Sequence, residues 1–481
     1  MEYNGLVTDL YQMTMTQGLL RIGKQNRKVV FDRFYRTNPF NGGYTVVAGL
    51  AHLADFVEHF RFSDDDIAYL RSLGTFGEDY LDFLKDFHFT GDIYAMPEGT
   101  VAFPGELTLR FHGTVAEAML METGLSMIMN HESLIATKAR RICSVAPHDG
   151  VMEFGLRRAQ GHSAGLWGAR SAMIGGFCGT SNVEAGKKFG IPVLGTMAHS
   201  WVMSFDSEIE AFREYARQYQ NPILLADTYH ALTSGIPHAI QVFKELRAEG
   251  KLPKVYGVRM DSGDLAYLSK EATRMFKEAG FDHPVIAGSN DLDEYAIQAL
   301  KEGGCTCNSW GVGTKCITAD GSPALGGVFK MSAKEVDGAF QPTMKISDNV
   351  AKMTNPGIKD VRRFYRKDTG KMITDLVCLA DEPMPDGGDF TLVTESAKWR
   401  RKELKAGTYT VKNMLQPVVL AGKVQALPKL SEVISYAKSE FDTLWPEYTR
   451  LLRPDAMEVN LSDKLQAMKE GIIEKELGNR K

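Results

Sequence analysis

Residues 255–280 read VYGVRMDSGDLAYLSKEATRMFKEAG, and this stretch decides the fold. It begins with a short apolar run at 255–260 and continues through the polar break Asp261-Ser262-Gly263-Asp264. Apolar residues then recur at helical spacing up to Gly280, where a left-handed helix end is favourable. The stretch therefore predicts one β-strand followed by one α-helix.

The same strand-then-helix pattern recurs on both sides of this stretch. The predicted strands are 151–156, 192–197, 222–226, 255–260, 284–287 and 307–312, and the predicted helices are 208–219, 238–249, 264–280 and 291–303. Strands that alternate with helices favour a parallel sheet of βα units. We expect an irregular (β/α) barrel rather than an open doubly wound sheet, because polar clusters follow all the strands instead of gathering at one switch point.

The two ends of the chain show a different pattern. Leu107, Leu109 and Phe111 alternate with polar residues, which predicts an antiparallel strand with one solvated face. Helices are expected at 56–62, 65–73 and 120–141, strands at 344–346, 362–365 and 372–378, and helices again at 430–443 and 455–475.

These elements predict an α/β protein with three segments. Segment 1–120 is expected to form the N-terminal part of an α+β domain, and segment 121–335 the barrel. Segment 336–481 is expected to wrap back onto the N-terminal part, so that both chain ends build one domain.

The composition is that of an ordinary globular protein. Of 481 residues, 24% are charged and 44% hydrophobic, and the net charge of -4 provides no basic field for nucleic acid or an anionic membrane. No apolar run reaches the ~18 residues of a membrane span, and the N-terminus lacks the apolar run of a signal peptide. The six scattered cysteines form no C-x-x-C pair and are expected to be buried thiols. We therefore expect a cytoplasmic protein that binds neither nucleic acid nor membrane.

Polar and glycine-rich clusters stand where each predicted strand ends. They are 157–158, 179–182, 195–200, 227–229, 259–264, 289–291 and 311–315. Barrel enzymes carry their catalytic groups at the C-terminal ends of the strands. We therefore expect these clusters to converge on one face.

Within these clusters, Arg259 and Asp261 are a cation and an anion two residues apart. A cap for the following helix explains Ser262 or Asp264, but neither member of this pair. An arginine can hold a carboxylate, and an aspartate can hold ribose hydroxyls. The alternative is a structural ion pair between neighbouring strands.

Loop 311–315, Gly-Val-Gly-Thr-Lys, follows the last clear strand. Its glycines let backbone N–H groups approach an anion, and Thr314 and Lys315 add donors. Barrel enzymes often bind phosphate in their last loops, although an isolated G-x-G-T is also common as a plain tight turn. The position of this loop favours a phosphate site.

His199 and Phe154 also lie at strand ends. A neutral imidazole can act as a base, a metal ligand or a phosphate-accepting nucleophile. A metal is the weakest option, since no second His or Cys stands nearby at a ligand spacing, and the other two roles stay open. The ring of Phe154 can stack on a flat ligand or belong to the core.

Together, these motifs resemble those of the nicotinate phosphoribosyltransferase family nearly end to end. The matching segments are 6–14 (LVTDLYQMT), 134–139 (LIATKA), 153–161 (EFGLRRAQG), 195–200 (GTMAHS), 259–264 (RMDSGD) and 311–315 (GVGTK). One departure is 127–132 (MIMNHE), where a more apolar segment containing glutamine is expected, and it touches no proposed site. The resemblance implies a type II phosphoribosyltransferase: an irregular α/β barrel beside an open-faced α+β sandwich domain, in a homodimer with active sites at the subunit interface.

The resemblance also implies an activity, namely ATP-coupled transfer of a phosphoribosyl group from 5-phosphoribosyl pyrophosphate to nicotinate in NAD salvage. The products are nicotinate mononucleotide and pyrophosphate. His199, Asp261 and Arg259 become the catalytic residues, and ATP transiently phosphorylates His199. We expect Mg²⁺ to bind mainly through the phosphates, with contacts from Asp227 or Asp261.

The remaining site residues are assigned by the same resemblance. Tyr11 of one subunit and Phe154 of the other are expected to sandwich the pyridine ring of nicotinate. Thr196, Arg259 and Ser181 complete that subsite, and Ser181 stands where nicotinamide-using relatives carry an aspartate that would repel nicotinate. The residues expected to bind the phosphoribosyl part are Arg157, Asp261, Ser289, Gly311, Gly313 and Thr314.

Two other functions stay open at the level of the sequence. A sister enzyme would use nicotinamide, which Ser181 disfavours, or quinolinate, whose second carboxylate requires more basic residues than the strand ends carry. A barrel that binds phosphorylated ligands without catalysis would have no need of a nucleophilic histidine.

Overall fold

The computed structural model describes residues 4–347, 352–385, 387–393 and 401–478. It divides into two compact units. The parallel-sheet unit consists of Lys138–Pro323, and the flanking unit consists of Met1–Thr137 together with Ala324–Lys481. The segment boundaries expected from the sequence stay a prediction.

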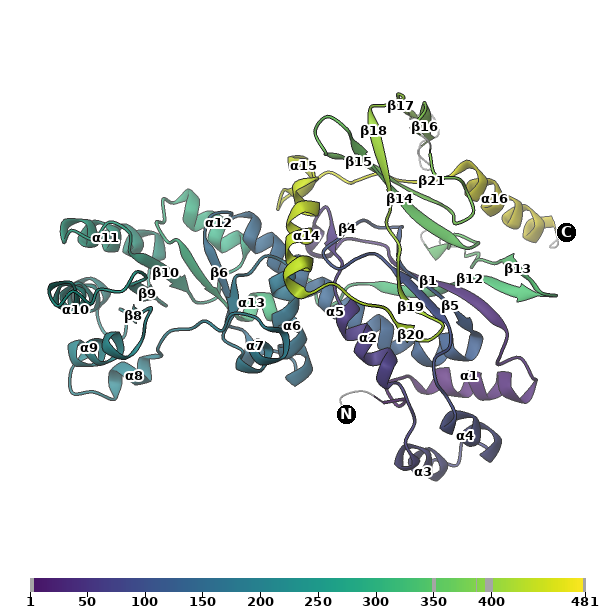
Figure 1. Cartoon of the computed structure of the whole chain (residues 1–481), viewed down its shortest axis with the longest axis horizontal. Helices are drawn as coiled ribbons and strands as arrows, with labels where there is room; N and C mark the ends of the chain where they lie inside the picture. The colour runs from purple at the N-terminus through teal and green to yellow at the C-terminus, as the bar shows by residue number, and fades with distance from the viewer. Residues whose placement is uncertain (1–3, 348–351, 386, 394–400, 479–481) are drawn as a thin grey trace. The chain divides into compact units, whose positions relative to one another are not determined.

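The parallel-sheet unit contains one six-stranded, all-parallel sheet (Figure 1). The strand order is β7-β6-β11-β10-β9-β8. The strands are β6 (Gly150–Glu153), β7 (Gly179–Thr180), β8 (Ile223–Leu225), β9 (Gly257–Met260), β10 (Val285–Ser289) and β11 (Ser309–Val312).

The parallel strands and the helices that alternate with them confirm the α/β class, and the last strand of this unit, β11, pairs with the first, β6, as a barrel requires. A single bridge joins Thr180 to Val193 beyond β7, where the sequence predicts strand 192–197. Within the described residues no ladder joins that segment to β8, so the ring of pairings is incomplete there.

The helices between these strands match the predicted βα rhythm. They are α6 (His162–Ile174), α7 (Val183–Phe189), α8 (His199–Met203), α9 (Glu208–Gln218), η3 (Ala231–Gly235), α10 (Ile236–Ala248), α11 (Leu265–Glu278), α12 (Glu294–Glu302) and α13 (Thr314–Ile317). Helix α11 begins where predicted, because the side chain of Asp264 accepts a hydrogen bond from the backbone N–H of Tyr267 at 2.9 Å. Its buried face, which includes Ala272 and Phe276, packs toward the aromatic residues Phe243 and Phe281.

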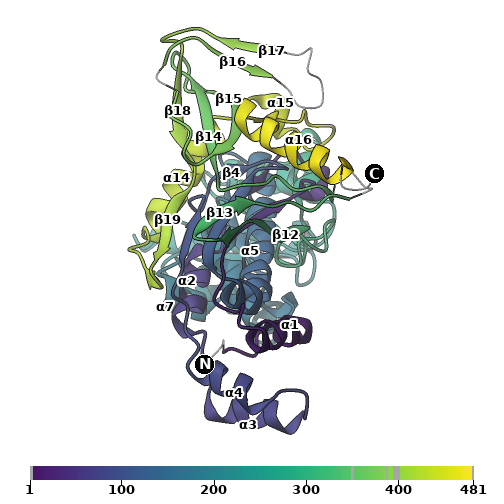
Figure 2. The same ribbon diagram turned by 90° about the vertical axis from the view of Figure 1, so that its right-hand side faces the viewer.

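The flanking unit contains two main sheets. The seven-stranded sheet has the order β13-β12-β1-β5-β3-β19-β20 and is antiparallel throughout, and the four-stranded sheet has the order β18-β14-β15-β21. Within this unit, Figures 1 and 2 show the four-stranded sheet at one end, helices α3 (Asp64–Ser72) and α4 (Glu78–Lys85) at the other, and the seven-stranded sheet between them.

The strands of the first sheet are β1 (Lys28–Tyr35), β3 (Asp92–Ala95), β5 (Leu107–Thr114), β12 (Gly327–Val336), β13 (Ala339–Pro342), β19 (Gln416–Leu420) and β20 (Lys423–Val424). Those of the second are β14 (Lys359–Arg366), β15 (Met372–Leu379), β18 (Tyr409–Asn413) and β21 (Val459–Leu461). Helices α1 (Leu10–Arg21), α2 (Leu50–His59), α5 (Val115–Ser144), α14 (Leu430–Asp442) and α16 (Asp463–Gly478) complete the main elements.

Several expectations for this unit were wrong in detail. Strand β5 has no solvated face: Thr108 is buried, and Arg110 is buried in an ion pair with Asp360 at 2.7 Å. The helix expected at 56–62 ends at His59, because Phe60 and Phe62 turn inward to pack on a further phenylalanine.

Two expectations near the C-terminus also failed. Residues 344–346 form no strand, and the helix expected at 455–475 begins only at Asp463, because residues 459–461 pair with β15 as a strand. Of the six thiols expected to be buried, that of Cys178 lies on an exposed residue.

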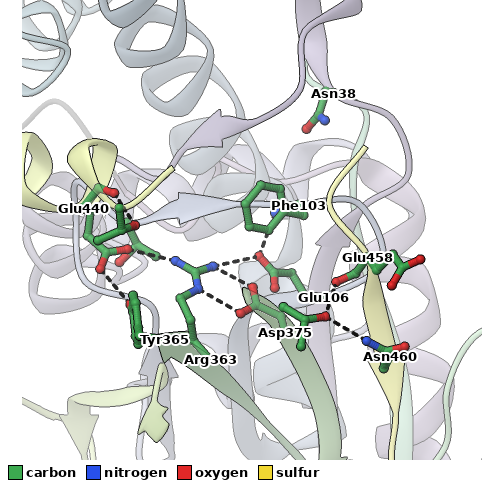
Figure 3. A network of polar contacts seen from close by, with 12 residues as sticks. Asn38, Phe103, Glu106, Arg363, Tyr365, Asp375, Glu440, Glu458 and Asn460 are labelled. Atoms are coloured by element: carbon green, nitrogen blue, oxygen red, sulfur yellow. Dashed lines mark hydrogen bonds and ion pairs between the residues drawn. The ribbon is translucent and has the colours of Figure 1, made fainter. Parts of the chain in front are cut away.

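A buried cluster of charges joins β14, β15 and α14 (Figure 3). Arg363 is fully buried and donates to both carboxylate oxygens of Asp375 at 2.8 and 2.6 Å, and to Glu440 at 2.8 Å. Tyr365 donates to the other oxygen of Glu440, and Glu106 lies 3.7 Å from Arg363. Burial, followed by repulsion from Asp375, raises the pKa of Glu106 well above its ordinary value.

Removing the cation from this cluster should destabilise the flanking unit. In Arg363→Met the carboxylates of Asp375 and Glu440 stay buried without their partner, which costs about 3–5 kcal/mol of unfolding free energy. Denaturant unfolding measures this loss. Arg366→Met is the control, since it removes only an exposed pair with Asp368. Equal stability of both variants would contradict the role of the cluster.

Candidate active site

The site residues that the sequence predicts in the parallel-sheet unit all lie at or just after the ends of its strands. Phe154 and Arg157 follow β6, Ser181 follows β7, and Thr196 and His199 follow the bridge at Val193. Asp227 follows β8, and Arg259 and Asp261 flank the end of β9. Ser289 ends β10, and Gly311, Gly313 and Thr314 belong to the end of β11. Parallel strands present these ends on the same side of the sheet. The side-chain contacts show which of these residues meet there.

Arg259 is the centre of the site. Its Nε donates to Ser289 at 2.8 Å, its Nη1 to the hydroxyl of Thr196 at 2.6 Å, and its Nη2 to Asp261 at 2.9 Å. Its side chain is only 17% exposed. One guanidinium therefore connects the ends of β9 and β10 with the loop that leads to His199.

Asp261 is held ionised by its neighbours. Burial alone would raise its pKa, but hydrogen bonds from Ser289 and Arg259, and the positive charge of Arg259, lower the pKa below its ordinary value. Its Oδ1 accepts both of these hydrogen bonds, while its Oδ2 lies 4.0 Å from Nε2 of His199. The carboxylate therefore faces the histidine with its second oxygen.

Asp227 braces the loop that carries Asp261. Its Oδ2 accepts a hydrogen bond from the backbone N–H of Asp261 at 2.8 Å and one from the hydroxyl of Ser262 at 2.6 Å. Its Oδ1 is buried, and within the described residues it has no hydrogen-bond partner. One carboxylate oxygen of Asp227 thus orients the loop, and the other can still accept hydrogen bonds or a cation.

His199 is the first residue of α8, and its side chain is 42% exposed. Its Nδ1 lies 3.1 Å from the hydroxyl of Thr228. The sequence places Thr228 in the polar cluster 227–229 but predicts no role for it, because only the fold brings the end of β8 against α8.

Phe154 packs directly on the backbone of β11. A Cβ atom on Gly311 would lie 2.7 Å from its ring, and one on Gly313 would lie 3.1 Å from its carbonyl oxygen. The neighbouring Glu153 is buried, and burial raises its pKa although Thr180 donates to it at 2.6 Å. Gly311 therefore leaves space for the ring of Phe154, and Gly313 leaves space for its backbone carbonyl.

Three further residues occupy the edge of the site. Arg157 and Ser181 are exposed, and Arg157 has no hydrogen bond or ion pair within the described part of the chain. Lys315, expected to add a donor to the phosphate loop, forms an ion pair with Asp320 at 2.7 Å. Tyr11 lies on α1 in the flanking unit and is 52% exposed, so its predicted contact with nicotinate stays a prediction.

A parallel α/β sheet with a cation, a carboxylate and a histidine at its strand ends defines an enzyme of the class that binds ligands outside the C-terminal edge of such a sheet. Comparison with known proteins gives the family. Models of the nicotinate phosphoribosyltransferase N-terminal domain, family and C-terminal domain match residues 6–130, 150–369 and 358–469. The chain belongs to the nicotinate phosphoribosyltransferase family.

Individual relatives support this membership over nearly the whole chain. A nicotinate phosphoribosyltransferase of Bacillus subtilis is 40% identical, covering 95% of this chain and 93% of its own length. One of Homo sapiens is 32% identical, covering 96% and 95% respectively. The crystal structure of human nicotinic acid phosphoribosyltransferase matches with a TM-score of 0.81 at 30% identity, over 96% of this chain and 99% of that one.

A methyl group at position 311 should disturb the site. In Gly311→Ala the new Cβ meets the ring of Phe154 at 2.7 Å, and such overpacking costs about 1–3 kcal/mol. Thermal unfolding measures the loss, and Gly303→Ala is the control because its Cβ would meet no atom closer than 3.4 Å. An unchanged melting temperature for Gly311→Ala would show that the ring moves away freely.

Proposed function

We propose that this protein transfers the phosphoribosyl group of 5-phosphoribosyl pyrophosphate to nicotinate and couples the reaction to ATP hydrolysis. Support comes from family membership and from one observation in particular, the meeting of Arg259, Asp261 and His199 at the strand ends. The products are nicotinate mononucleotide and pyrophosphate, together with ADP and phosphate from ATP. This reaction belongs to NAD salvage.

Nicotinate binds through its carboxylate in this proposal. A guanidinium carries five N–H donors, and Arg259 directs only some of them at Ser289, Thr196 and Asp261. The remaining donor on Nη2 is available to a carboxylate in a charge-assisted hydrogen bond. Phe154 supplies an apolar face for the pyridine ring, and Thr196 limits how that ring can turn.

The phosphoribosyl group binds next to the nicotinate. Asp261 and Ser289 are placed to contact ribose hydroxyls, while the backbone of Gly311 and Gly313, the hydroxyl of Thr314 and the unpaired Arg157 contact phosphate. Loss of pyrophosphate develops positive charge on the ribose ring, which the ionised Asp261 stabilises. The pyridine nitrogen then forms the new bond to the anomeric carbon, so positioning supplies much of the rate.

His199 couples this step to ATP. A ring nitrogen of His199 accepts the γ-phosphoryl group, ADP leaves, and water later takes the phosphoryl group from the histidine as phosphate. Its side chain is part-exposed and faces Asp261 at 4.0 Å, which suits a nucleophile that must meet a second substrate. Hydrolysis of the phosphohistidine drives an otherwise poorly favourable synthesis.

The carboxylates of the site suit Mg²⁺ held mainly by phosphates. The described residues contain no group of three or more metal-ligating side chains, so a closed protein cage is not the arrangement that they offer. Asp227 has a buried oxygen without a partner there, and Asp261 turns its second oxygen toward His199. One or two carboxylates added to substrate phosphates are the usual Mg²⁺ set, and the ion would neutralise charge on the leaving group.

Ser181 favours the acid over the amide. A carboxylate at this strand end would accept a hydrogen bond from nicotinamide and repel nicotinate, whereas the exposed, neutral Ser181 carries no charge that repels the acid. A charge-assisted hydrogen bond from Arg259 contributes ~1.5–3 kcal/mol, or roughly 10- to 150-fold preference for the acid. Comparing nicotinate, nicotinamide and quinolinate as substrates tests this choice, and turnover of nicotinamide alone would contradict it.

A homodimer with shared active sites completes the proposal, with Tyr11 of each subunit reaching the nicotinate bound to the partner. The surface of α1 supports it, since Leu10, Tyr11 and Met15 on the helix and Ile22 at its C-cap are large apolar or aromatic residues that lie exposed. None of the helices in the described part of the chain is long and apolar enough to cross a membrane. The cytoplasmic location stays part of the proposal.

Replacing His199 by alanine should abolish ATP coupling. We expect His199→Ala to form nicotinate mononucleotide slowly without ATP, and to form no ADP in response to the other substrates. Mass spectrometry should find acid-labile phosphate on His199 of the wild-type protein after exposure to ATP.

The matched control for this prediction is His162→Ala, which removes an exposed histidine paired with Glu184 at the surface. It should couple ATP hydrolysis as the wild type does. Unchanged ADP formation in His199→Ala would refute the phosphohistidine.

A further inference from the structure

The ring of His199 contacts one hydroxyl from a neighbouring strand end. The 3.1 Å separation between its Nδ1 and Oγ1 of Thr228 is the hydrogen bond that the ring makes, while Asp261 lies farther away, at 4.0 Å from Nε2. The His199 side chain is 42% exposed, so neighbouring side chains enclose only part of the ring. Its orientation therefore depends on Thr228 more than on any other side chain of the site.

Both partners of this contact are tied to the same helix, α9. On the side of His199, the indole Nε1 of Trp201 in α8 donates to the backbone carbonyl of Ala211 at 3.0 Å. On the side of Thr228, Ser234 at the end of the same loop donates to the buried carboxylate of Glu208, which His238 also contacts at 2.7 Å. Helix α9 thus contacts both the helix that carries His199 and the turn that follows Thr228.

The loop that carries Thr228 has little freedom to move. It continues into the π-helical turn η3 and reaches Gly235, where a Cβ atom would lie 1.8 Å from the carbonyl oxygen of Ala226. The turn therefore packs directly against Ala226, which follows β8 and lies two residues before Thr228. Such close packing restricts the backbone just before Thr228.

We propose that Thr228 is a positioning residue for phosphoryl transfer to His199, which it orients through the hydrogen bond to Nδ1. This inference rests on the proposed function, because it requires that His199 accept a phosphoryl group. Thr228 contacts the histidine and is not assigned to nicotinate or to ribose. Its loss should therefore affect the ATP half-reaction more than the synthesis of nicotinate mononucleotide.

The test compares Thr228→Val, which keeps the shape and removes the hydroxyl, with Thr228→Ser, which keeps the hydroxyl. A neutral hydrogen bond corresponds to about a 3- to 10-fold effect, so the ratio of ADP formed to nicotinate mononucleotide formed should fall about 3- to 10-fold in Thr228→Val. Thr228→Ser should keep most of the wild-type ratio of ADP to nicotinate mononucleotide. The control is Thr273→Val, which removes a remote surface hydroxyl bonded to Thr306.

A spectroscopic measurement distinguishes orientation from general damage. The ¹⁵N resonance of Nδ1 in His199 should shift in Thr228→Val and stay in place in Thr273→Val. An unchanged ratio and resonance in Thr228→Val, or an equal loss of ADP formation and synthesis, would overturn the proposal for Thr228 alone. If the wild type makes nicotinate mononucleotide with no ADP at all, the proposed coupling fails and the role of Thr228 fails with it.

Discussion

The guanidinium of Arg259 connects elements that are far apart in the chain. Its hydrogen bonds reach Thr196, Ser289 and Asp261, so the ends of two neighbouring strands and the loop before α8 share one rigid, planar partner. Arginine suits this place because its donors diverge from a fixed fork, whereas a lysine could hold only one of these positions firmly. These bonds fix the positions of Thr196, Ser289 and Asp261 relative to one another.

Two consequences for the chemistry come from that arrangement. Asp261 stays ionised because Arg259 and Ser289 donate to it, and its second oxygen lies 4.0 Å from Nε2 of His199. The polar groups are also oriented before any ligand binds, so little reorganisation is needed when charge develops on a reacting group. A site built on strand ends, and braced by Asp227 and α9, is rigid enough to provide this.

The sequence predicts the elements with strong local patterns and misses contacts made over long distances. Helix α11 and the polar ends of the βα strands follow from periodicity and position, and Arg259, Asp261 and His199 meet as expected. Strand β7 has two residues, too few for any pattern. The buried polar face of β5 escaped prediction because Arg110 finds Asp360 some 250 positions away in the chain.

The same limit explains which site details were missed. The pairing of Lys315 with Asp320 and the contact of Thr228 with His199 depend on how loops fold over the strand ends, which residue type and spacing do not specify.

The most direct test of the account is a crystal structure of the protein with nicotinate and 5-phosphoribosyl pyrophosphate. We predict the nicotinate carboxylate within hydrogen-bond distance of Arg259, with the sugar phosphate at loop 311–315. A complex in which Arg259 touches neither substrate would contradict it.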